Sequence, residues 1–216
     1  PIKRRSPSFT LVAVVTSLRT TLENEQKAVF QILDRYRSDD ELFMAKRDEL
    51  VELIRPAGLA ENKSDVILRA LRYLEEKYNR SWERIAQMPL VRAREELLSL
   101  KGLGPKSVDC ILSVGLGRPS IAVDVNVFRV TSRILNLPWS STPDYSNQEH
   151  VRVVKETLDD LVGGDSFLAQ ILHTLFLLHG KKVCRAKCNQ ENSSVQEFCL
   201  KCDSDYLEKP WQKGLF

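Results

Sequence analysis

Residues 100–124 read LKGLGPKSVDCILSVGLGRPSIAVD, and this stretch decides how the rest of the chain is interpreted. Gly102 and Gly104 form a Gly-x-Gly turn, and glycine adopts backbone angles that are closed to other residues. Pro105 suits the first position of a helix, because its missing N–H would be unpaired there in any case. The stretch therefore predicts a hairpin turn that leads directly into a helix.

Lys106 lies in the first turn of this expected helix, where the helix dipole is positive. A structural lysine would lie more comfortably at the other end, and proximity to the positive end favours the neutral, nucleophilic amine. Asp124 follows eighteen positions later. The sequence thus places a turn suited to gripping DNA beside an amine nucleophile and a carboxylate, which points to function.

Length and composition limit what such a site can belong to. The chain has 216 residues, enough for one large domain or two small lobes, and 43% of them are hydrophobic, which is ample for a buried core. Its net charge of +3 permits binding to a polyanion without requiring it. No apolar run approaches the roughly 20 residues of a membrane span, and Leu11–Val15 is too short for a signal peptide. We therefore expect an intracellular protein without a membrane-spanning segment.

The apolar spacing is helical nearly everywhere, since apolar residues such as Val29, Ile32, Leu33 and Tyr36 recur at steps of three and four. Strand-like alternation is almost missing. The sequence therefore predicts an all-α fold. The expected helices cover about 9–20, 22–36, 39–53, 62–78, 81–87, 89–99, 105–115, 124–135, 147–162 and 165–178.

Three segments together carry a family resemblance: LKGLGPKSVDCIL, then IAVDVNVFRV at 121–130, then HGKKVC at 179–184 with three further cysteines behind it. With these segments the chain resembles the helix-hairpin-helix DNA glycosylases, most closely their endonuclease III-like branch. The resemblance extends from about Phe9 to Cys202. It implies two helical lobes that flank a cleft. They would be a six-helix lobe over 10–119 that contains the helix-hairpin-helix and a second lobe over 120–216, after a tail over 1–9.

The resemblance implies a DNA repair enzyme that flips a damaged base, by default an oxidised pyrimidine, out of duplex DNA and excises it. Lys106 would attack the sugar and form a Schiff base, which allows β-elimination at the abasic site. Asp124 would stabilise positive charge on the sugar and help to activate the amine, while Gly102, Leu103 and Gly104 hold a phosphate. Two alternatives stay open: a weakly active or non-catalytic module that binds damaged DNA, and a monofunctional glycosylase in which Asp124 activates water.

Several of these residues also have a structural interpretation. Asp124 precedes a helical apolar run, where it would serve as a helix N-cap, and the two roles are compatible. Asp109 lies three residues after Lys106 and is expected to be its surface ion-pair partner. Cys110 lies on an apolar helix face and is expected to be a core residue. His150 is expected to be exposed.

The other cysteines have the spacing Cys184-x3-Cys188-x10-Cys199-x2-Cys202, and clustered thiolates suit zinc or an iron-sulfur cluster. The spacing alone does not decide between the two. The family resemblance implies a [4Fe-4S] cluster with a structural role. The chain departs from the family in its short first interval and in having no cysteine after the close pair, so that Cys188 takes the place of the missing ligand.

Other departures concern DNA recognition. Arg19 stands where the family offers a glutamine to fill the gap left by the flipped base, and Asn126 stands where it has a histidine. In the loop 58–63, which would wedge into the opposite strand, no large apolar residue is evident at the tip. Arg185 and Lys187 either contact DNA phosphates or form a solvated loop. We expect the type of reaction to be retained and the base preference to be altered.

The expected partner is double-stranded DNA that contains damaged bases or abasic sites, bound by a monomer. The expected location is therefore intracellular, with the DNA: the cytoplasm or nucleoid in a bacterium or archaeon, and the nucleus or an organelle in a eukaryote.

Overall fold

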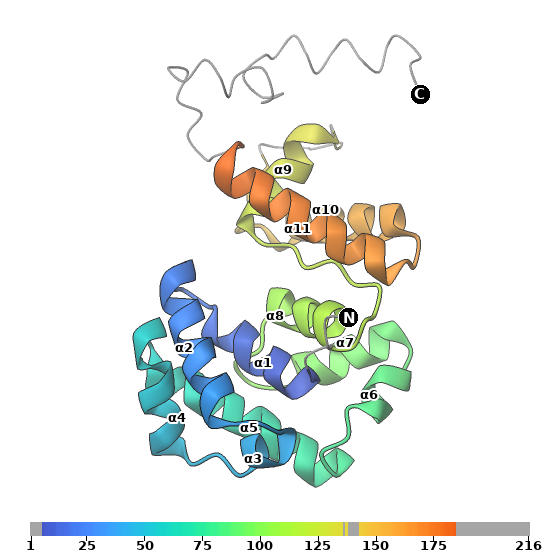
Figure 1. Ribbon diagram of the computed structural model, residues 1–216. Coiled ribbons are helices and arrows are strands. Elements are labelled where there is room, and N and C mark those ends of the chain that lie inside the picture. Colours follow the sequence, from blue (N-terminus) through green and yellow to red (C-terminus); the bar gives the residue numbers. More distant parts are fainter. Residues whose placement is uncertain (1–5, 136, 138–142, 185–216) are drawn as a thin grey trace, which may run out of the picture. The chain divides into compact units, whose positions relative to one another are not determined.

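The computed structural model describes residues 6–135, 137 and 143–184 (Figure 1). Every regular element within these ranges is helical and none is a strand, which confirms the all-α prediction. The chain divides into two compact units, Pro1–Ser120 and Ile121–Phe216. No described helix combines the length and the apolar composition that crossing a bilayer requires.

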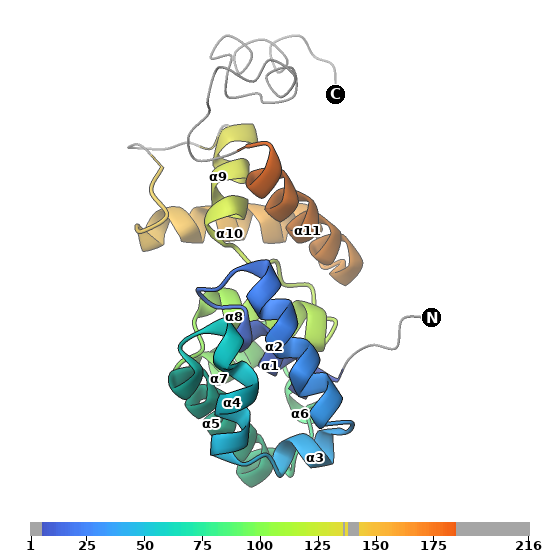
Figure 2. The same ribbon diagram turned by 60° about the vertical axis from the view of Figure 1, so that its left-hand side comes forward.

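Unit 1 is a bundle packed around one interior helix, α1 (Pro7–Thr16), which contacts α2, α3, α5 and α8 (Figure 2). Ser6 begins this helix, because its hydroxyl accepts a hydrogen bond from the Phe9 amide (3.3 Å) and Pro7 occupies the first turn. The other helices are α2 Leu22–Arg35, α3 Asp39–Phe43, α4 Arg47–Ile54, α5 Ala60–Tyr78, α6 Glu83–Gln87, α7 Leu90–Leu98 and α8 Pro105–Cys110, with a 3-10 turn, η1, at Arg55–Ala57.

The core of unit 1 consists of apolar side chains from every helix of this bundle, the shortest included. Leu11, Ile32, Leu74 and Ile111 are fully buried there, and Cys110 is buried as expected for a core residue. Truncating one of the four to alanine would cost about 2–5 kcal/mol of unfolding free energy, so the bundle is a firm support for the turn between α7 and α8.

The helix α8 continues into one π-helical turn, η2 (Ile111–Gly115). The Leu116 amide bonds the carbonyl oxygen of Ile111, five residues earlier, at 3.0 Å. Beyond this turn Arg118 donates hydrogen bonds to the carbonyl oxygens of Ala86 and Met88 at the end of α6. The predicted helix over 105–115 is therefore present, but its second half is wider than an α-helix.

The predicted helix over 39–53 is wrong in one respect, because the chain breaks at Met44–Lys46 into α3 and α4. Apolar residues at 42–45 and within 50–54 flank four charged residues, and both groups are compatible with one continuous helix, so periodicity did not reveal the break. The contact that requires the turn is long-range: Glu49 accepts hydrogen bonds from Arg35 (2.5 Å) and Tyr36 (3.0 Å) at the end of α2. The start of α4 is thereby held against α2.

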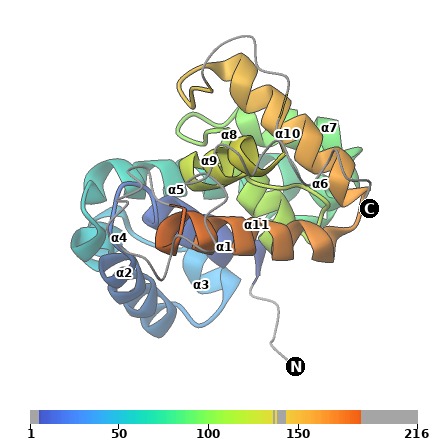
Figure 3. The same cartoon turned by 90° about the horizontal axis from the view of Figure 1, so that it is seen from above.

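Unit 2 contains α9 (Val125–Ile134), α10 (Gln148–Val162) and α11 (Ser166–Lys182) (Figure 3). Both α10 and α9 pack against α11. Their shared core includes Ile121, Val127, Phe128, Val154 and Leu158. The helices begin at the side-chain caps Asp124, Asn147 and Asp165, each of which accepts hydrogen bonds from two backbone amides.

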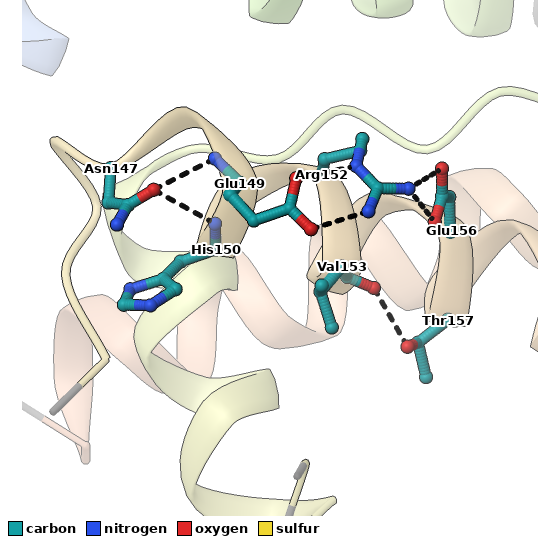
Figure 4. Close-up of polar contacts among 7 residues, drawn as sticks. All are labelled: Asn147, Glu149, His150, Arg152, Val153, Glu156 and Thr157. Atoms are coloured by element: carbon teal, nitrogen blue, oxygen red, sulfur yellow. Dashed lines mark hydrogen bonds and ion pairs between the residues drawn. The ribbon is translucent and has the colours of Figure 1, made fainter. Parts of the chain in front are cut away.

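The start of α10 corrects the expectation for His150 (Figure 4). Asn147 Oδ1 accepts hydrogen bonds from the amides of Glu149 (2.9 Å) and His150 (3.4 Å), and Arg152 pairs with Glu149 and Glu156 along the exposed side. His150 itself is only 7% exposed, and its Nδ1 accepts a hydrogen bond from the Asp144 amide (3.0 Å). It is a packed residue that fixes the loop before α10.

Candidate active site

The turn between α7 and α8 contains two glycines with different constraints. Gly102 has φ +105°, and a Cβ atom there would lie 2.3 Å from Val66 Cγ2 on α5. Gly104 is the N-cap of α8 with φ −94°, and a Cβ atom there would meet open space. Between them Leu103 is buried in the core and anchors the turn. The first glycine is required by the protein's own packing, whereas the second leaves the backbone open to a ligand.

We predict that Gly102→Ala destabilises the protein by about 2–4 kcal/mol, because the substitution adds both backbone strain and a clash with Val66. The matched control is Gly104→Ala, which should cost less than about 1 kcal/mol, since its φ is ordinary and its surroundings are open. Urea denaturation of both variants checks the difference. Equal midpoints for the two variants would contradict this account of the turn.

Lys106 lies in the first turn of α8, half-buried, at the exit of this hairpin. It makes no hydrogen bond or ion pair with the residues described in unit 1. The expected pairing with Asp109 is therefore wrong. Asp109 is only 2% exposed and pairs instead with Arg94 of α7, Nε to Oδ1 at 2.9 Å, while the Ser120 hydroxyl donates to the same oxygen at 3.0 Å. A buried carboxylate thus ties α8 to α7 and leaves the Lys106 amine uncommitted.

Asp124 in unit 2 is the N-cap of α9, as its structural interpretation predicts. Its Oδ1 accepts hydrogen bonds from the amides of Asn126 and Val127, both at 2.8 Å, and its Oδ2 accepts one from Asn126 Nδ2 at 3.1 Å. Asn126 thus orients the second carboxylate oxygen from the position where the family has a histidine. Lys106 belongs to unit 1 and Asp124 to unit 2.

Tyr145 is a further residue whose phenol is affected by the charge of Asp124, and no sequence pattern identifies it. Its hydroxyl donates a hydrogen bond to the Val123 carbonyl oxygen (3.3 Å), and its ring packs edge-on against Phe128 with centroids 5.6 Å apart. Burial, together with the negative charge of Asp124, raises the pKa of the Tyr145 phenol. It stays a neutral hydrogen-bond donor beside the carboxylate.

Cys184, directly after α11, is the one expected metal ligand within the described residues; Cys188, Cys199 and Cys202 lie outside them, as do Arg185 and Lys187. Its side chain is buried, and Arg133 Nη1 lies 2.9 Å from its sulfur. A cation that donates to sulfur suits a thiolate ligand. Within the described part of the chain, no group of three potential ligands is assembled.

The end of α11 is also fixed against α9. Arg129 donates from Nε to the Cys184 carbonyl oxygen and from Nη2 to that of Gly180 and to Asn126 Oδ1, each at 2.8 Å. A Cβ atom at Gly180 would lie 2.7 Å from Asn126 Cβ. Only glycine therefore permits this close approach of the two helices.

Three turns of unit 1 carry left-handed backbone angles at residues other than glycine: those at Arg19, at Leu59 and at Asn79–Arg80, where α5 ends. Arg19 is exposed after α1 with φ +51°, and Leu59, the N-cap of α5, also has φ +51° and is 53% exposed. Left-handed angles are uncommon in residues with side chains and mark strained or functional positions. The sequence-based statement that no large apolar residue stands at the tip of loop 58–63 is therefore wrong, since Leu59 stands there.

The comparison with known families is decisive for identity: the family of HhH-GPD superfamily base excision DNA repair proteins matches residues 12–156. The chain belongs to this superfamily. This glycosylase is 29% identical to endonuclease III of Thermotoga maritima over 209 residues, which are 96% of this chain and 86% of the relative. The hairpin, Lys106 and Asp124 all lie inside the matched range.

Solved structures agree with the placement of this glycosylase in the endonuclease III-like branch. A trapped covalent intermediate of endonuclease III with DNA is 30% identical, with a TM-score of 0.65, and covers 86% of this chain and 79% of its own. A non-covalent endonuclease III–DNA complex is 28% identical to this chain, with a TM-score of 0.67. The match covers 90% of this chain and 83% of the chain in the complex. A thermostable thymine-DNA glycosylase shares the fold, with a TM-score of 0.70 at 18% identity. The match covers 95% of this chain and 87% of that glycosylase.

Proposed function

We propose that this base excision repair glycosylase is bifunctional: it removes a damaged base from duplex DNA and then cleaves the abasic strand as an AP lyase. The observation that carries the proposal is Lys106, a half-buried amine at the exit of the hairpin that no carboxylate of unit 1 neutralises. The likeness to an endonuclease III trapped covalently on DNA supports it. Oxidised pyrimidines are the proposed substrates.

The chemistry begins when the damaged nucleotide is extruded from the stack, at a cost of a few kcal/mol. The Lys106 amine then attacks the sugar C1′ through its nitrogen lone pair. The bond between C1′ and the base breaks, and its electron pair leaves with the base, which takes up a proton. Opening of the sugar ring gives a Schiff base. Loss of a C2′ proton expels the 3′ phosphate as the C3′–O bond breaks, and water finally releases the lysine.

Asp124 has two roles in this scheme. Its carboxylate stabilises the positive charge that develops on the sugar, and it helps to activate the Lys106 amine. The cap geometry serves both roles, because the hydrogen bonds from Asn126 and Val127 hold the carboxylate in one orientation. Tyr145 keeps its proton and adds a hydrogen-bond donor in the same part of unit 2.

The proposed DNA contacts come from the exposed backbone and charges of unit 1 and from two basic residues that follow α11 in the sequence. The amides of Gly102 and Gly104 hold a phosphate, which the open space at Gly104 allows to approach. The Leu103 amide, which was expected from the sequence to share this role, donates to the Leu100 carbonyl oxygen (3.0 Å) and shapes the turn instead. Arg19 fills the gap left by the extruded nucleotide, and Leu59 is the apolar wedge between neighbouring bases. Arg185 and Lys187 add phosphate contacts. The proposed partner is thus duplex DNA with damaged bases or abasic sites, bound by a monomer inside the cell.

The proposed cofactor is a structural [4Fe-4S] cluster held by Cys184, Cys188, Cys199 and Cys202. Cys184 fits such a group, since its sulfur is buried and receives a hydrogen bond from Arg133. The cluster supplies four metal–thiolate bonds that cross-link the end of the chain. The purified protein should be brown, with a broad visible band and bound iron and sulfide; a colourless protein that contains zinc would contradict the cluster.

The experiment that tests the function is borohydride trapping on a panel of duplexes, each with one oxidised pyrimidine or an abasic site. The Schiff base predicts a covalent protein–DNA complex after reduction, and strand cleavage without reduction. Base release without trapping or cleavage would instead select a monofunctional glycosylase in which Asp124 activates water. Binding to damaged duplex without base release would select a DNA-binding module that has lost turnover.

A further inference from the structure

Lys63, in the first turns of α5, is a buried lysine that the proposed chemistry does not use. Its side chain is only 4% exposed, and its Nζ donates hydrogen bonds to two backbone carbonyl oxygens, those of Thr16 and Ala57, both at 2.9 Å. Burial lowers the pKa of this lysine, and the charge of Glu25 opposes that effect. One ammonium group therefore joins three segments of unit 1 in the interior.

Each of the two carbonyl groups that accept from Lys63 belongs to the last residue of a helical element, directly before an exposed turn. Thr16 is the last residue of α1, and Arg19 follows it by three residues. Ala57 is the last residue of η1, and Leu59 follows it by two. We name these segments the Arg19 turn (residues 17–20) and the Leu59 turn (residues 58–59). Each begins at a carbonyl that Lys63 holds, and each presents an exposed side chain from a left-handed backbone.

The two hydrogen bonds of Lys63 have a structural role and also a geometric one. Taking an ammonium group out of water is costly, and the bonds to the Thr16 and Ala57 carbonyl oxygens, which an apolar side chain would leave unpaired, offset that cost. The ammonium group also determines the relative position of the two carbonyl groups, because its N–H donors diverge from a single nitrogen atom. It fixes the two carbonyl groups at a set separation, so that the two turns cannot move independently.

We propose that Lys63 is a positioning residue that couples the Arg19 turn and the Leu59 turn into a single DNA-inserting device. The proposal rests on the function given above, in which an apolar wedge and a cation enter the duplex where a nucleotide is extruded. Two side chains that must enter together gain affinity when the free protein already holds them in their bound arrangement. The strained angles of Arg19 and Leu59 persist because Lys63 anchors the backbone behind them.

The first test is a double-mutant cycle with Arg19→Ala and Leu59→Ala. The readout is affinity for a duplex that contains a tetrahydrofuran abasic-site analogue, on which no chemistry occurs. In the wild-type background the two losses should be coupled by about tenfold, because residues of one device do not contribute additively. Additive losses in the wild-type background would overturn the proposal without any substitution of Lys63.

The second test repeats the cycle in Lys63→Met, which keeps the length of the side chain and removes its donors. The losses from Arg19→Ala and Leu59→Ala should become additive, with a coupling factor of about one. A 2-aminopurine base placed opposite the analogue should no longer increase in fluorescence when the protein binds. Lys63→Gln, which retains two N–H donors, should restore part of both signals. Coupling that persists in Lys63→Met would overturn the proposal.

The matched control is Trp82→Phe, which also removes a buried hydrogen bond from unit 1, the one from Nε1 to the Ser8 hydroxyl (2.9 Å). It should lower stability yet leave the coupling of Arg19 and Leu59 intact. A loss of coupling in Trp82→Phe equal to that in Lys63→Met would mean a general structural effect and would also overturn the proposal. These measurements need no catalysis, so failed borohydride trapping would refute the lyase function and leave this test standing.

Discussion

Lys106→Gln is expected to abolish the borohydride-trapped complex and to slow strand cleavage at abasic sites by at least about a thousandfold. Glutamine is uncharged and nearly as long as lysine, and its amide nitrogen cannot form a Schiff base. Lys106 makes no hydrogen bond or ion pair with the described residues of unit 1, so its loss should leave the fold intact. The measurement is single-turnover cleavage and trapping on an abasic duplex, with urea denaturation as the check on folding.

The matched control is Lys101→Gln, which removes the same charge from an exposed position on the other side of Gly102. It should weaken DNA binding modestly and reduce its salt dependence, while trapping at saturating protein stays at the wild-type level. Trapping that survives in Lys106→Gln and disappears in Lys101→Gln would place the nucleophile elsewhere and refute the assignment.

Asp124→Ser is expected to lower the rate of base excision by about a hundredfold or more and to leave stability within about 0.5 kcal/mol of wild type. Serine is as good an N-cap as aspartate, so the hydrogen bonds to the Asn126 and Val127 amides can be replaced. It carries no charge to stabilise the developing cation. Single-turnover base release, measured beside urea denaturation, separates the two roles of this residue.

The companion variant Asp124→Ala removes the cap as well as the charge. It should lose about 1 kcal/mol of stability in addition to the activity lost in Asp124→Ser. A wild-type rate of base release in Asp124→Ser would show that the carboxylate serves only as a cap. An equally reduced rate of base release in both variants, with only Asp124→Ala destabilised, is the result that supports two separable roles.

The parts of the fold that the sequence predicted are those that local signals determine. The cap at Asp124, the proline that begins α8 and the glycines of the hairpin act within a few residues, so one chain suffices to identify them. Helical periodicity placed most helices within a few residues of their ends. The family resemblance could be recognised because the hairpin, lysine and aspartate occur at a fixed spacing along the chain.

What the sequence could not predict depends on contacts between distant segments. Asp109 pairs with Arg94, fifteen residues away, and not with its helical neighbour Lys106. The exposure of Leu59 follows from the left-handed angle at the start of α5, which no local pattern specifies. Lys63 appeared in the sequence as one more lysine of a polar loop, and its burial arises only when α1 and η1 pack beside α5.

The π-helical turn at Ile111–Gly115 has a consequence for how the chain can vary in length. The turn contains one residue more than an α-helical turn, so a gene that lost one codon there would encode an uninterrupted α-helix in which the Leu116 amide still bonds the Ile111 carbonyl oxygen. The residues beyond the turn would keep their orientation, with Arg118 at the carbonyl of Met88 and Ser120 at Asp109. The same deletion in the α-helical part of α8 would instead rotate the residues beyond it by about 100° around the helix axis. A one-residue deletion should therefore be tolerated in the π-helical turn and not in the turns before it.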